Sequence, residues 1–495
     1  MMYGEEKSDS LIVAANLANN PQGAESVERR SGAKGNAEQP HMRRTQSRES
    51  MSQRLSRVRE AAKQRKKERF TALFHLLTAE ALENAFLSLS RKAAAGVDGV
   101  RWKDYAENLK VNIADLHRRL HQGSYRAQPG RRHYIPKADG KQRPLGIASL
   151  EDKIVQYALV KILNAVYEND FMGFSYGFRP GRSQHNALDA LATGLVRTNV
   201  NWVLDADISQ FFDKVSHEWL IRFIEHRIGD QRVIRLIRKW LTAGTSEEGE
   251  WRASEEGTPQ GAVISPLLAN IYLHYVFDLW AHQWRRRHAT GNVVMVRYAD
   301  DIVIGFDKRI DAQCFRIAMQ RRLKEFGLTV HPKKTRLMEF GRFAAENRAS
   351  RGKGKPETFN FLGFTHISGK DRSGRFMLIR KTRRDRMTAT LKAIKDGLRK
   401  RWHYSIPEQG KWLRRVVQGY LNYHSVPGNY PMMRKFRIYV TDLWRRALRR
   451  RSQQDDTTWT KANRLAAVWL PKVRVLHPWP VERFTARHPR QEPGE

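Results

Sequence analysis

Two stretches of the chain place carboxylates where a short apolar strand ends. Residues 293–306 have the pattern of two strands of β-branched residues around a tight turn that holds Asp300 and Asp301. Residues 202–207 form another apolar strand, which ends at Asp207. Burying such acids beside apolar strands costs several kcal/mol unless a cation compensates them. The pattern predicts a divalent-metal site, with a solvated hairpin turn as the alternative.

Helical spacing of apolar residues alternates with strand-like segments along the chain. Apolar positions recur at helical spacing in residues 70–89, 151–167 and 315–326. Residues 131–147 instead contain two short strand-like arms around an Asp-Gly turn, which predicts a basic hairpin. Helices mixed with antiparallel strands indicate an α+β fold.

The last quarter of the chain has three apolar stripes at helical spacing, separated by a Pro-Gly break before the third. They predict a three-helix bundle with basic outer faces. The stripes are Met387, Leu391, Ile394, Leu398 and Trp402; Trp412, Val416, Tyr420 and Tyr423; and Phe436, Val440, Leu443 and Ala447.

The charge balance indicates a polyanionic partner. Lys and Arg total 90 against 51 Asp and Glu, a formal net charge of +39, and residues 371–495 contribute +20 of it through 30 basic and 10 acidic residues. Such a balance favours nucleic acid and salt-dependent affinity. No apolar run approaches the roughly 18 to 20 residues of a membrane-spanning helix, and no signal peptide is visible. We therefore expect a protein of the bacterial cytoplasm or nucleoid with no membrane partner.

The beginning of the chain and its cysteine content set two further limits. Residues 1 to about 60 lack a sustained apolar period, so the basic leader (1–65) is expected to be disordered, or ordered only on RNA. Within residues 51–68 a basic helix is expected, either lying on RNA or simply solvated. Cys314 is the single cysteine, so the chain can build neither a disulfide framework nor a cysteine-rich zinc site.

Several motifs follow one another in the order found in one enzyme family. Residues 298–301 resemble the signature turn of reverse transcriptases, and residues 207–213 resemble their first catalytic motif. The remaining matching segments are 96–100, 131–147, 174–183, 257–272, 327–335 and 359–364. Residues 419–424 resemble the maturase region of group II intron proteins, whereas the cysteine pairs of their HNH endonuclease are missing. The chain thus resembles group II intron-encoded reverse transcriptases of the form that lacks this endonuclease.

This resemblance implies a right-hand polymerase with fingers, a palm built on an antiparallel sheet, and a three-helix thumb. The expected units are a leader (1–65), an N-terminal extension (66–130), fingers and palm (131–372), a thumb or maturase domain (373–452) and a basic DNA-binding tail (453–495).

The resemblance also implies the site residues. Asp207, Asp300 and Asp301 are the expected catalytic residues, and with the Ile208 carbonyl they would hold two Mg²⁺ ions, with Mn²⁺ as a substitute. The expected nucleotide-binding residues are Lys137, Arg143, Phe212, Gln260 and Lys334. Phe212 is interpreted either as a steric gate against ribonucleotides or as palm packing, and Lys334 either as a general acid near the leaving group or as a surface lysine.

The expected partners are intron RNA, an RNA template with its DNA primer, target DNA and dNTPs, with a homodimer left open. The residues expected to contact RNA or template are Gly96, Asp98, Gly99, Arg179, Arg182, Tyr420 and Tyr423. The predicted function is RNA-directed DNA synthesis together with splicing assistance. The alternatives are a domesticated reverse transcriptase in defence or repair, and an RNA-binding splicing factor without polymerase activity.

Overall fold

The computed structural model describes residues 50–136, 142–451 and 457–487. Lys137 and most of the predicted leader therefore lie outside the described residues. The chain mixes helices with three sheets, so the predicted α+β class is confirmed. In the described part of the chain, no helix is long and apolar enough to cross a membrane.

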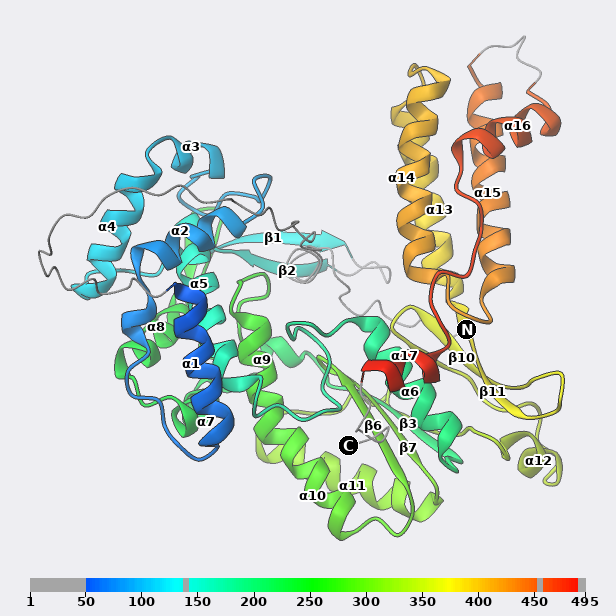
Figure 1. Ribbon diagram of the computed structural model, residues 1–495, viewed down its shortest axis with the longest axis horizontal. Helices are drawn as coiled ribbons and strands as arrows, with labels where there is room; N and C mark the ends of the chain where they lie inside the picture. The colour runs from blue at the N-terminus through cyan, green and yellow to red at the C-terminus, as the bar shows by residue number, and fades with distance from the viewer. Residues whose placement is uncertain (1–49, 137–141, 452–456, 488–495) are drawn as a thin grey trace, which may run out of the picture.

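Helix α5 (Leu150–Tyr167) is the centre of the N-terminal half, because nearly all of its side chains are buried. Helices α1 (Met51–Gln64) and α2 (Ala79–Ser88) pack against it, and α3 (Trp102–Glu107) and α4 (Leu109–His121) complete the group (Figure 1). The periodic segment that begins at residue 70 becomes regular helix only at residue 79. Before it, the short helix η2 (Phe74–Leu76) is held by Asp230, whose carboxylate accepts the backbone N–H groups of Leu73 and Phe74 at 2.9 and 2.8 Å.

The predicted basic hairpin is present as β1 (Gly130–Pro136) and β2 (Gln142–Ile147), which pair antiparallel. A second hairpin, β4 (Thr245–Glu247) and β5 (Glu250–Arg252), extends the sheet in the order β2-β1-β4-β5. Strand β4 follows α7 (His217–Arg227) and α8 (Gln231–Thr242), so this sheet joins segments more than one hundred residues apart in the sequence.

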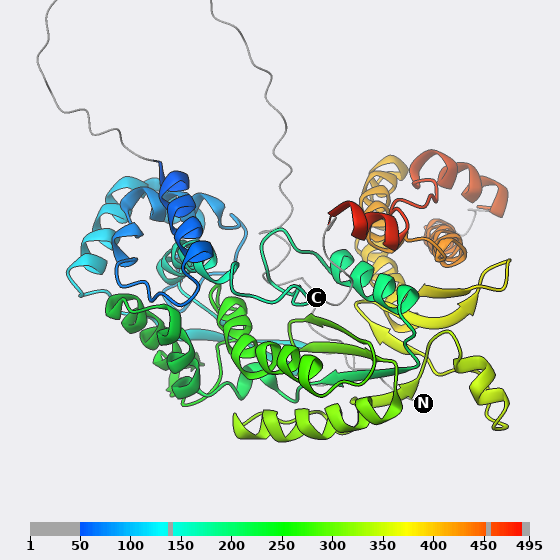
Figure 2. The ribbon, with the colours of Figure 1, turned by 60° about the horizontal axis from the view of Figure 1, so that its bottom comes forward.

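The carboxylate-bearing strands form a second sheet in the order β6-β7-β3-β8. Its strands are β6 (Val293–Tyr298), β7 (Asp301–Phe306), β3 (Trp202–Asp207) and β8 (Arg336–Glu339), and all neighbours are antiparallel. Both faces are covered: α6 (Gln184–Arg197) lies on one face and α11 (Arg309–Glu325) on the other (Figure 2). This explains the continuous apolar runs of β6 and β7, since alternate side chains enter two different cores.

The α11 face of this sheet is closed by a helix that changes its winding. Helix α9 (Ser265–Leu273) continues through a π-helical turn, η4 (His274–Asp278), into α10 (Leu279–Arg287). Such π-helical turns frequently occur at functional sites. Here the turn brings the carboxylate of Asp278 to the end of β6.

The three predicted stripes lie on α13 (Arg384–Lys400), α14 (Ile406–His424) and α15 (Tyr430–Arg449), except that Trp402 follows the end of α13. These helices stand apart from the N-terminal helices (Figure 1). A three-stranded sheet, β9 (Phe359–Phe361), β10 (Phe364–Lys370) and β11 (Phe376–Thr382), connects them to the rest, and the short α12 (Ala344–Ala349) precedes it. Asn429, which is fully buried, ties the base of α15 to β11 by bonding both the backbone and the hydroxyl of Thr382.

The segment predicted as a DNA-binding tail contains two helices that return to the protein. Helix α16 (Trp459–Trp469) packs on α14 and α15, and α17 (Pro480–Arg487) packs on α6. Phe484 of α17 is buried in the core shared with α6. Arg483 donates to both carboxylate oxygens of Asp189, one at 2.9 Å, and Asp189 also pairs with the buried Arg380 of β11.

Candidate active site

The strand register brings the predicted carboxylates together at one end of the sheet. Asp207 of β3 lies directly opposite Asp301 of β7, and both are 5% exposed. The turn between β6 and β7 consists of Ala299, with a positive φ of 56°, and the half-buried Asp300. Directly opposed carboxylates repel each other, so this register needs a positive charge between or beside them.

One such charge is supplied by the loop after α11. Lys334 Nζ lies 3.1 Å from Asp207 Oδ2. The loop is held against β3 by the backbone, because His331 N donates to Asp207 O at 2.7 Å and Ser209 N donates to Thr329 O at 2.8 Å. Burial lowers the pKa of Lys334 below its ordinary value. The structure thus places a lysine ammonium group beside Asp207, and the predicted divalent-metal site stays a prediction.

The donor atoms at this end are of the kind that hard divalent cations prefer. Carboxylate oxygens of Asp207, Asp300 and Asp301 and the backbone carbonyl of Ile208 are all oxygen ligands. Within the described residues, no three His, Cys, Asp or Glu side chains are close enough to enclose a metal ion by themselves. An open set of this type fits Mg²⁺, which usually keeps waters and is bound by one or two carboxylates together with substrate phosphates.

The β1–β2 hairpin and two further loops meet beside Phe212, which is half-buried in the short helix η3 (Phe211–Asp213). A cavity of about 140 Å³ there is lined by residues of all three segments, among them Arg132, Pro144, Phe212, Asp213 and Gln260. Gln260 holds the arrangement: its carbonyl accepts Gly146 N at 2.7 Å, and its side chain donates to Asp213 Oδ1 at 3.0 Å. Phe212, Gln260 and the strand that carries Arg143 are therefore neighbours, as the motifs predict.

A family comparison identifies the domain to which this site belongs. Residues 135–366 match the model of the family described as "Reverse transcriptase (RNA-dependent DNA polymerase)". These residues form a reverse transcriptase domain. It contains both acidic strand ends, the cavity beside Phe212 and the Lys334 loop.

Curated relatives agree with this identification. Over 206 residues the chain is 43% identical to "Protein YkfC" of Escherichia coli strain K12, which covers 41% of this chain and 54% of that protein. It is 37% identical over 223 residues to "Group II intron-encoded protein LtrA" of Lactococcus lactis subsp. cremoris (44% and 37%), and 26% identical over 393 residues to "Putative COX1/OXI3 intron 1 protein" of Saccharomyces cerevisiae (66% and 46%). The chain spans about half or less of these relatives. The resemblance to group II intron reverse transcriptases is confirmed.

Two arginines that are predicted to contact template, Arg179 and Arg182, bond the protein's own loop in this structure, and a template contact at either residue stays a prediction. Arg179 is 5% exposed and donates to both carboxylate oxygens of Glu168 and, at 2.8 Å, to the carbonyls of Met172 and Ser175. Arg182 also donates to the Ser175 carbonyl, at 3.0 Å, and burial lowers its pKa to about 10. Both guanidinium groups hold the protein's own loop before α6.

Two further residues that are predicted to contact RNA, Tyr420 and Tyr423, make contacts within the protein, and an RNA contact at either residue stays a prediction. Tyr420 is 8% exposed and its ring stacks on Phe436 with 3.6 Å between centroids, so it belongs to the core of helices α13 to α15. Tyr423 is half-buried and donates its hydroxyl to Leu362 O at 2.9 Å, which fastens α14 to the turn between β9 and β10. The apolar stripe predicted for this helix accounts for both positions better than an RNA-binding face does.

The loop before α3 divides into a buried part and an exposed part. Gly96 is buried, and a Cβ atom there would come within 2.5 Å of Ser149 Cα, so the glycine is required by the close approach to the start of α5. Asp98 and Gly99 are exposed, and Asp98 accepts the backbone N–H of Val100 at 3.2 Å. An RNA contact at Asp98 and Gly99 stays a prediction.

Sequence reasoning missed the charged network beneath the catalytic turn. Arg297, on β6, is completely buried and pairs with Asp278, which is also completely buried. A signal was available in the sequence, because a single arginine inside the apolar run of residues 293–306 requires a buried partner.

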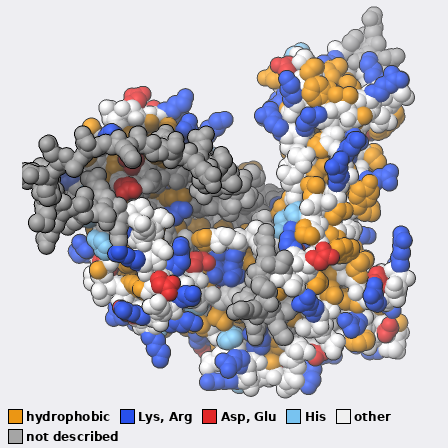
Figure 3. All heavy atoms as spheres, viewed as in Figure 1, with side chains coloured by type: hydrophobic (Ala, Val, Ile, Leu, Met, Phe, Trp, Pro, Cys, Tyr) orange, Lys and Arg blue, Asp and Glu red, His pale blue; other side chains and the backbone are white. Residues whose placement is uncertain are grey.

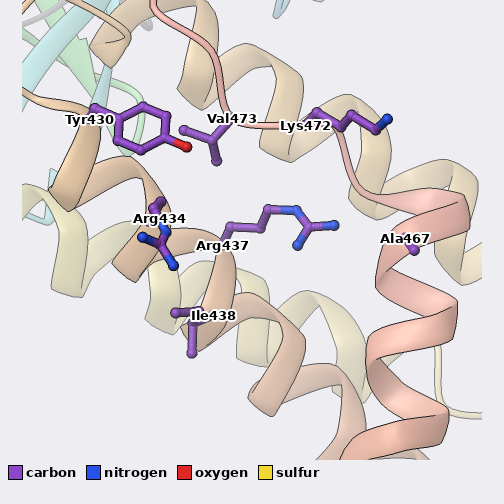
Figure 4. Close-up of a pocket in the computed structure, with 7 residues that line it drawn as sticks. All are labelled: Tyr430, Arg434, Arg437, Ile438, Ala467, Lys472 and Val473. Atoms are coloured by element: carbon purple, nitrogen blue, oxygen red, sulfur yellow. The ribbon is translucent and has the colours of Figure 1, made fainter.

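Lys and Arg side chains are spread over the surface of both the N-terminal part and the helices that stand apart from it (Figure 3). A groove of about 390 Å³ lies between α15 and the segment after α16 (Figure 4). It is lined by Tyr430, Arg434, Arg437, Ile438, Ala467, Lys472 and Val473. Arg437 donates to the carbonyls of Pro471 and Ala466 at 3.1 and 2.7 Å and so closes the end of α16, whereas Arg434 and Lys472 are exposed.

Proposed function

We propose that the protein is the RNA-directed DNA polymerase of a group II intron, built as a right hand in which residues 131–372 are fingers and palm and residues 373–452 are the thumb. The observation that carries the proposal is the pairing of Asp207 with Asp301 at the end of a buried sheet, within a reverse transcriptase domain. The alternative of a solvated hairpin turn is disfavoured because Asp301 is 5% exposed and Asp300 is half-buried.

The reaction would be attack of the primer 3′-oxygen on the α-phosphate of a dNTP. Asp207, Asp300, Asp301 and the Ile208 carbonyl would hold two Mg²⁺ ions, which supply electrostatic stabilisation of the attacking and leaving oxygens. Lys334 would lie near the pyrophosphate that leaves. Its lowered pKa suits a proton donor to that group, because general acids work best when their pKa approaches the working pH.

Nucleotide binding and selection are proposed for residues 137 and 143 and for two residues that line the cavity beside the hairpin, Phe212 and Gln260. Lys137 and Arg143 would bind the triphosphate, since arginine offers a bidentate fork to phosphate and lysine a point charge. Gln260 would face the nascent base pair, and the ring of Phe212 would exclude a 2′-hydroxyl by contact.

Splicing assistance is proposed as a second function of the same chain. It is supported by the similarity to a protein named as group II intron-encoded and by the excess of 30 basic over 10 acidic residues in the last quarter. Target DNA would be contacted by the tail and by the groove that contains Arg434 and Lys472. A domesticated reverse transcriptase, or a splicing factor without polymerase activity, stays as the alternative.

Primer extension on an RNA template with Mg²⁺ and dNTPs tests the polymerase proposal. We expect DNA products that depend on the RNA template and on the divalent cation. Protein that binds RNA tightly but extends no primer would contradict the polymerase function and leave the RNA-binding function standing. Splicing of a candidate intron RNA, with and without protein, tests the second function independently.

A further inference from the structure

The catalytic turn rests on one buried guanidinium group whose five N–H donors all have acceptors. Arg297 Nε and Nη2 donate to the two carboxylate oxygens of Asp278 at 2.7 and 2.5 Å. Nη2 also donates to Ser175 Oγ at 2.7 Å, and Nη1 donates to Asn270 Oδ1 at 3.1 Å. The remaining Nη1 donor bonds Ala299 O at 3.0 Å. A guanidinium has five N–H donors, so none remains for another role.

The bond to Ala299 connects this network to the catalytic carboxylates. Ala299 occupies the left-handed region, which a residue with a side chain adopts only when its surroundings hold it there. Its carbonyl belongs to the peptide unit that leads into Asp300. Fixing this carbonyl therefore fixes the orientation of the next residue and the point at which β7 begins with Asp301.

The other partners of Arg297 come from rigid elements around the turn. Asp278 lies in the π-helical turn η4, and Asn270 lies on α9. Asn270 also donates to Gly177 O at 2.7 Å, and a Cβ atom on Gly177 would come within 2.3 Å of Ala299 N. The backbone around residue 177 thus packs directly on the turn, and the same network holds it in place.

The charge balance of the network is neutral. Asp278 is the single counter-charge within hydrogen-bonding distance of Arg297 among the described residues. Nearby His274 is kept uncharged at neutral pH, since burial lowers its pKa to about 4. A guanidinium group that only balanced a buried carboxylate would need two of its N–H donors. Arg297 uses a further N–H donor to bond the Ala299 carbonyl in the turn.

We infer that Arg297 is a positioning residue for the polymerase site, which holds the Ala299 carbonyl so that Asp300 and Asp301 meet Asp207 in a metal-binding arrangement. The part of this inference that concerns DNA synthesis rests on the proposed function, whereas the part that concerns the conformation of the turn does not. The role goes beyond stability, because removing the fork should loosen the turn while the folded protein survives.

The test compares two double variants that each replace a buried Arg–Asp pair by apolar residues. Replacing both charges is often tolerated by the fold, whereas removing one leaves a buried charge without compensation. The test variant is Arg297→Met with Asp278→Leu. The matched control is Arg227→Met with Asp170→Leu, because Arg227 is 3% exposed, pairs with Asp170 at 2.7 Å and donates to backbone carbonyls far from the site.

Hydrogen exchange of the segment 298–303 and Mn²⁺ binding followed by electron paramagnetic resonance are the measurements. In the test variant we expect exchange at least tenfold faster in this segment and Mn²⁺ affinity at least tenfold weaker. In the control we expect both to stay within twofold of the unmodified protein. Neither measurement requires synthesis, so failure of the polymerase proposal would appear separately, as absence of primer extension by the unmodified protein.

A single variant, Arg297→Lys, covers the case in which the double variant does not fold. Lysine keeps the positive charge beside Asp278 but offers three donors from one nitrogen and cannot reproduce the planar fork. We expect it to fold, with faster exchange in 298–303 and weaker Mn²⁺ binding. Unchanged exchange and unchanged Mn²⁺ affinity in the lysine variant, or equal losses in the two double variants, would overturn the inference.

Discussion

The catalytic sheet and the C-terminal helices use arginine in opposite ways. Beneath the catalytic turn one arginine is fully buried, and each of its donors has a named acceptor. In residues 371–495, 30 basic residues face only 10 acidic ones, and many of them lie on exposed helix faces. A buried guanidinium fixes the positions of atoms, whereas an exposed excess of charge creates a long-range field that attracts a polyanion. Substitutions at the buried site should abolish DNA synthesis, and substitutions of the exposed basic residues should weaken nucleic-acid binding.

Asp301→Asn should give the largest difference between loss of DNA synthesis and loss of RNA binding. The substitution keeps the shape of the side chain but removes a metal-binding charge, so primer extension should fall at least 10³-fold, equivalent to about 4 kcal/mol of activation free energy. Binding of RNA should stay within twofold, measured by filter retention. Asp307→Asn, at the other end of β7, is the matched control and should extend primers normally. A parallel loss of RNA binding would mean that the sheet itself had been disturbed.

A smaller effect on selectivity, without loss of synthesis, is expected from Phe212→Ala. Removal of the ring opens space beside the sugar, so the ratio of ribonucleotide to deoxyribonucleotide incorporation should rise roughly 10- to 100-fold. Single-nucleotide extension with matched dNTP and rNTP pairs measures it. Phe211→Leu is the control, because Phe211 is buried beside Phe212 and should change stability but not the ratio. The same ratio in Phe212→Ala and the unmodified protein would mean that Phe212 only packs.

The exposed charges of the groove in Figure 4 should govern binding alone. For Arg434→Ala with Lys472→Ala, we expect roughly tenfold weaker binding to a mixed-sequence DNA duplex and a shallower salt dependence, by about one in the log–log slope for each lost phosphate contact. Primer extension at saturating primer–template should stay unchanged. The control is Arg316→Ala with Lys324→Ala, which removes two exposed charges from α11. Equal weakening of DNA binding in both double variants would mean that the groove contributes no more than other exposed basic residues do.

The smallest effect should be a pH dependence of α17 docking. His185 of α6 stacks on His477 at 4.0 Å, and burial lowers the pKa of His185 to about 2 and also lowers that of His477. Since the docked state keeps these rings neutral, its stability is complete above the ordinary histidine pKa near 6.5 and declines below it. Between pH 7 and pH 6 the undocked fraction should rise about threefold through His185, and His477 should add to this rise.

Hydrogen exchange of residues 480–487, corrected for the intrinsic effect of pH, measures this docking. His185→Phe keeps an aromatic ring against His477 but removes one titrating group, so its pH dependence should be shallower. The other titratable groups that face the pair are Asp189, Arg380, His424 and Arg483. If the pH dependence of exchange is as steep in His185→Phe as in the unmodified protein, His185 is not its cause.

Local patterns were sufficient to predict the elements and part of the site. The acidic strand ends, the basic hairpin and the three helical stripes each depend on neighbouring residues, and the structure has strands and helices at these places. The side-by-side placement of Asp207 and Asp301 could also be expected, because antiparallel strands with acids at their ends bring them to one edge.

Pairings over long distances could not be predicted in this way. Arg483 and Asp189 are 294 residues apart, and nothing near either residue indicates the other. The same limit applies to the internal contacts of Arg179 and Tyr420, because arginine and tyrosine in a motif look alike whether their partners are nucleotides or buried carbonyls and rings. Burial decides between these alternatives, and burial is a property of the whole fold.

The return of α17 to α6 has a mechanical consequence. Within the described residues, the helices α13 to α15 are attached to the sheet domain at their base, where α13 follows β11 and Tyr423 bonds Leu362, and also through the tail that runs from α16 to the contact between Arg483 and Asp189. A body that is held at its base and at a second anchorage can rotate easily only about the line that joins them, whereas a body that is held at its base alone can swing more widely. Removing residues 457–495 should therefore leave the three helices folded but free to sample wider orientations, which would appear as a larger radius of gyration in X-ray scattering. The docked helix α17 would then be a second attachment point that restricts the rotation of α13 to α15.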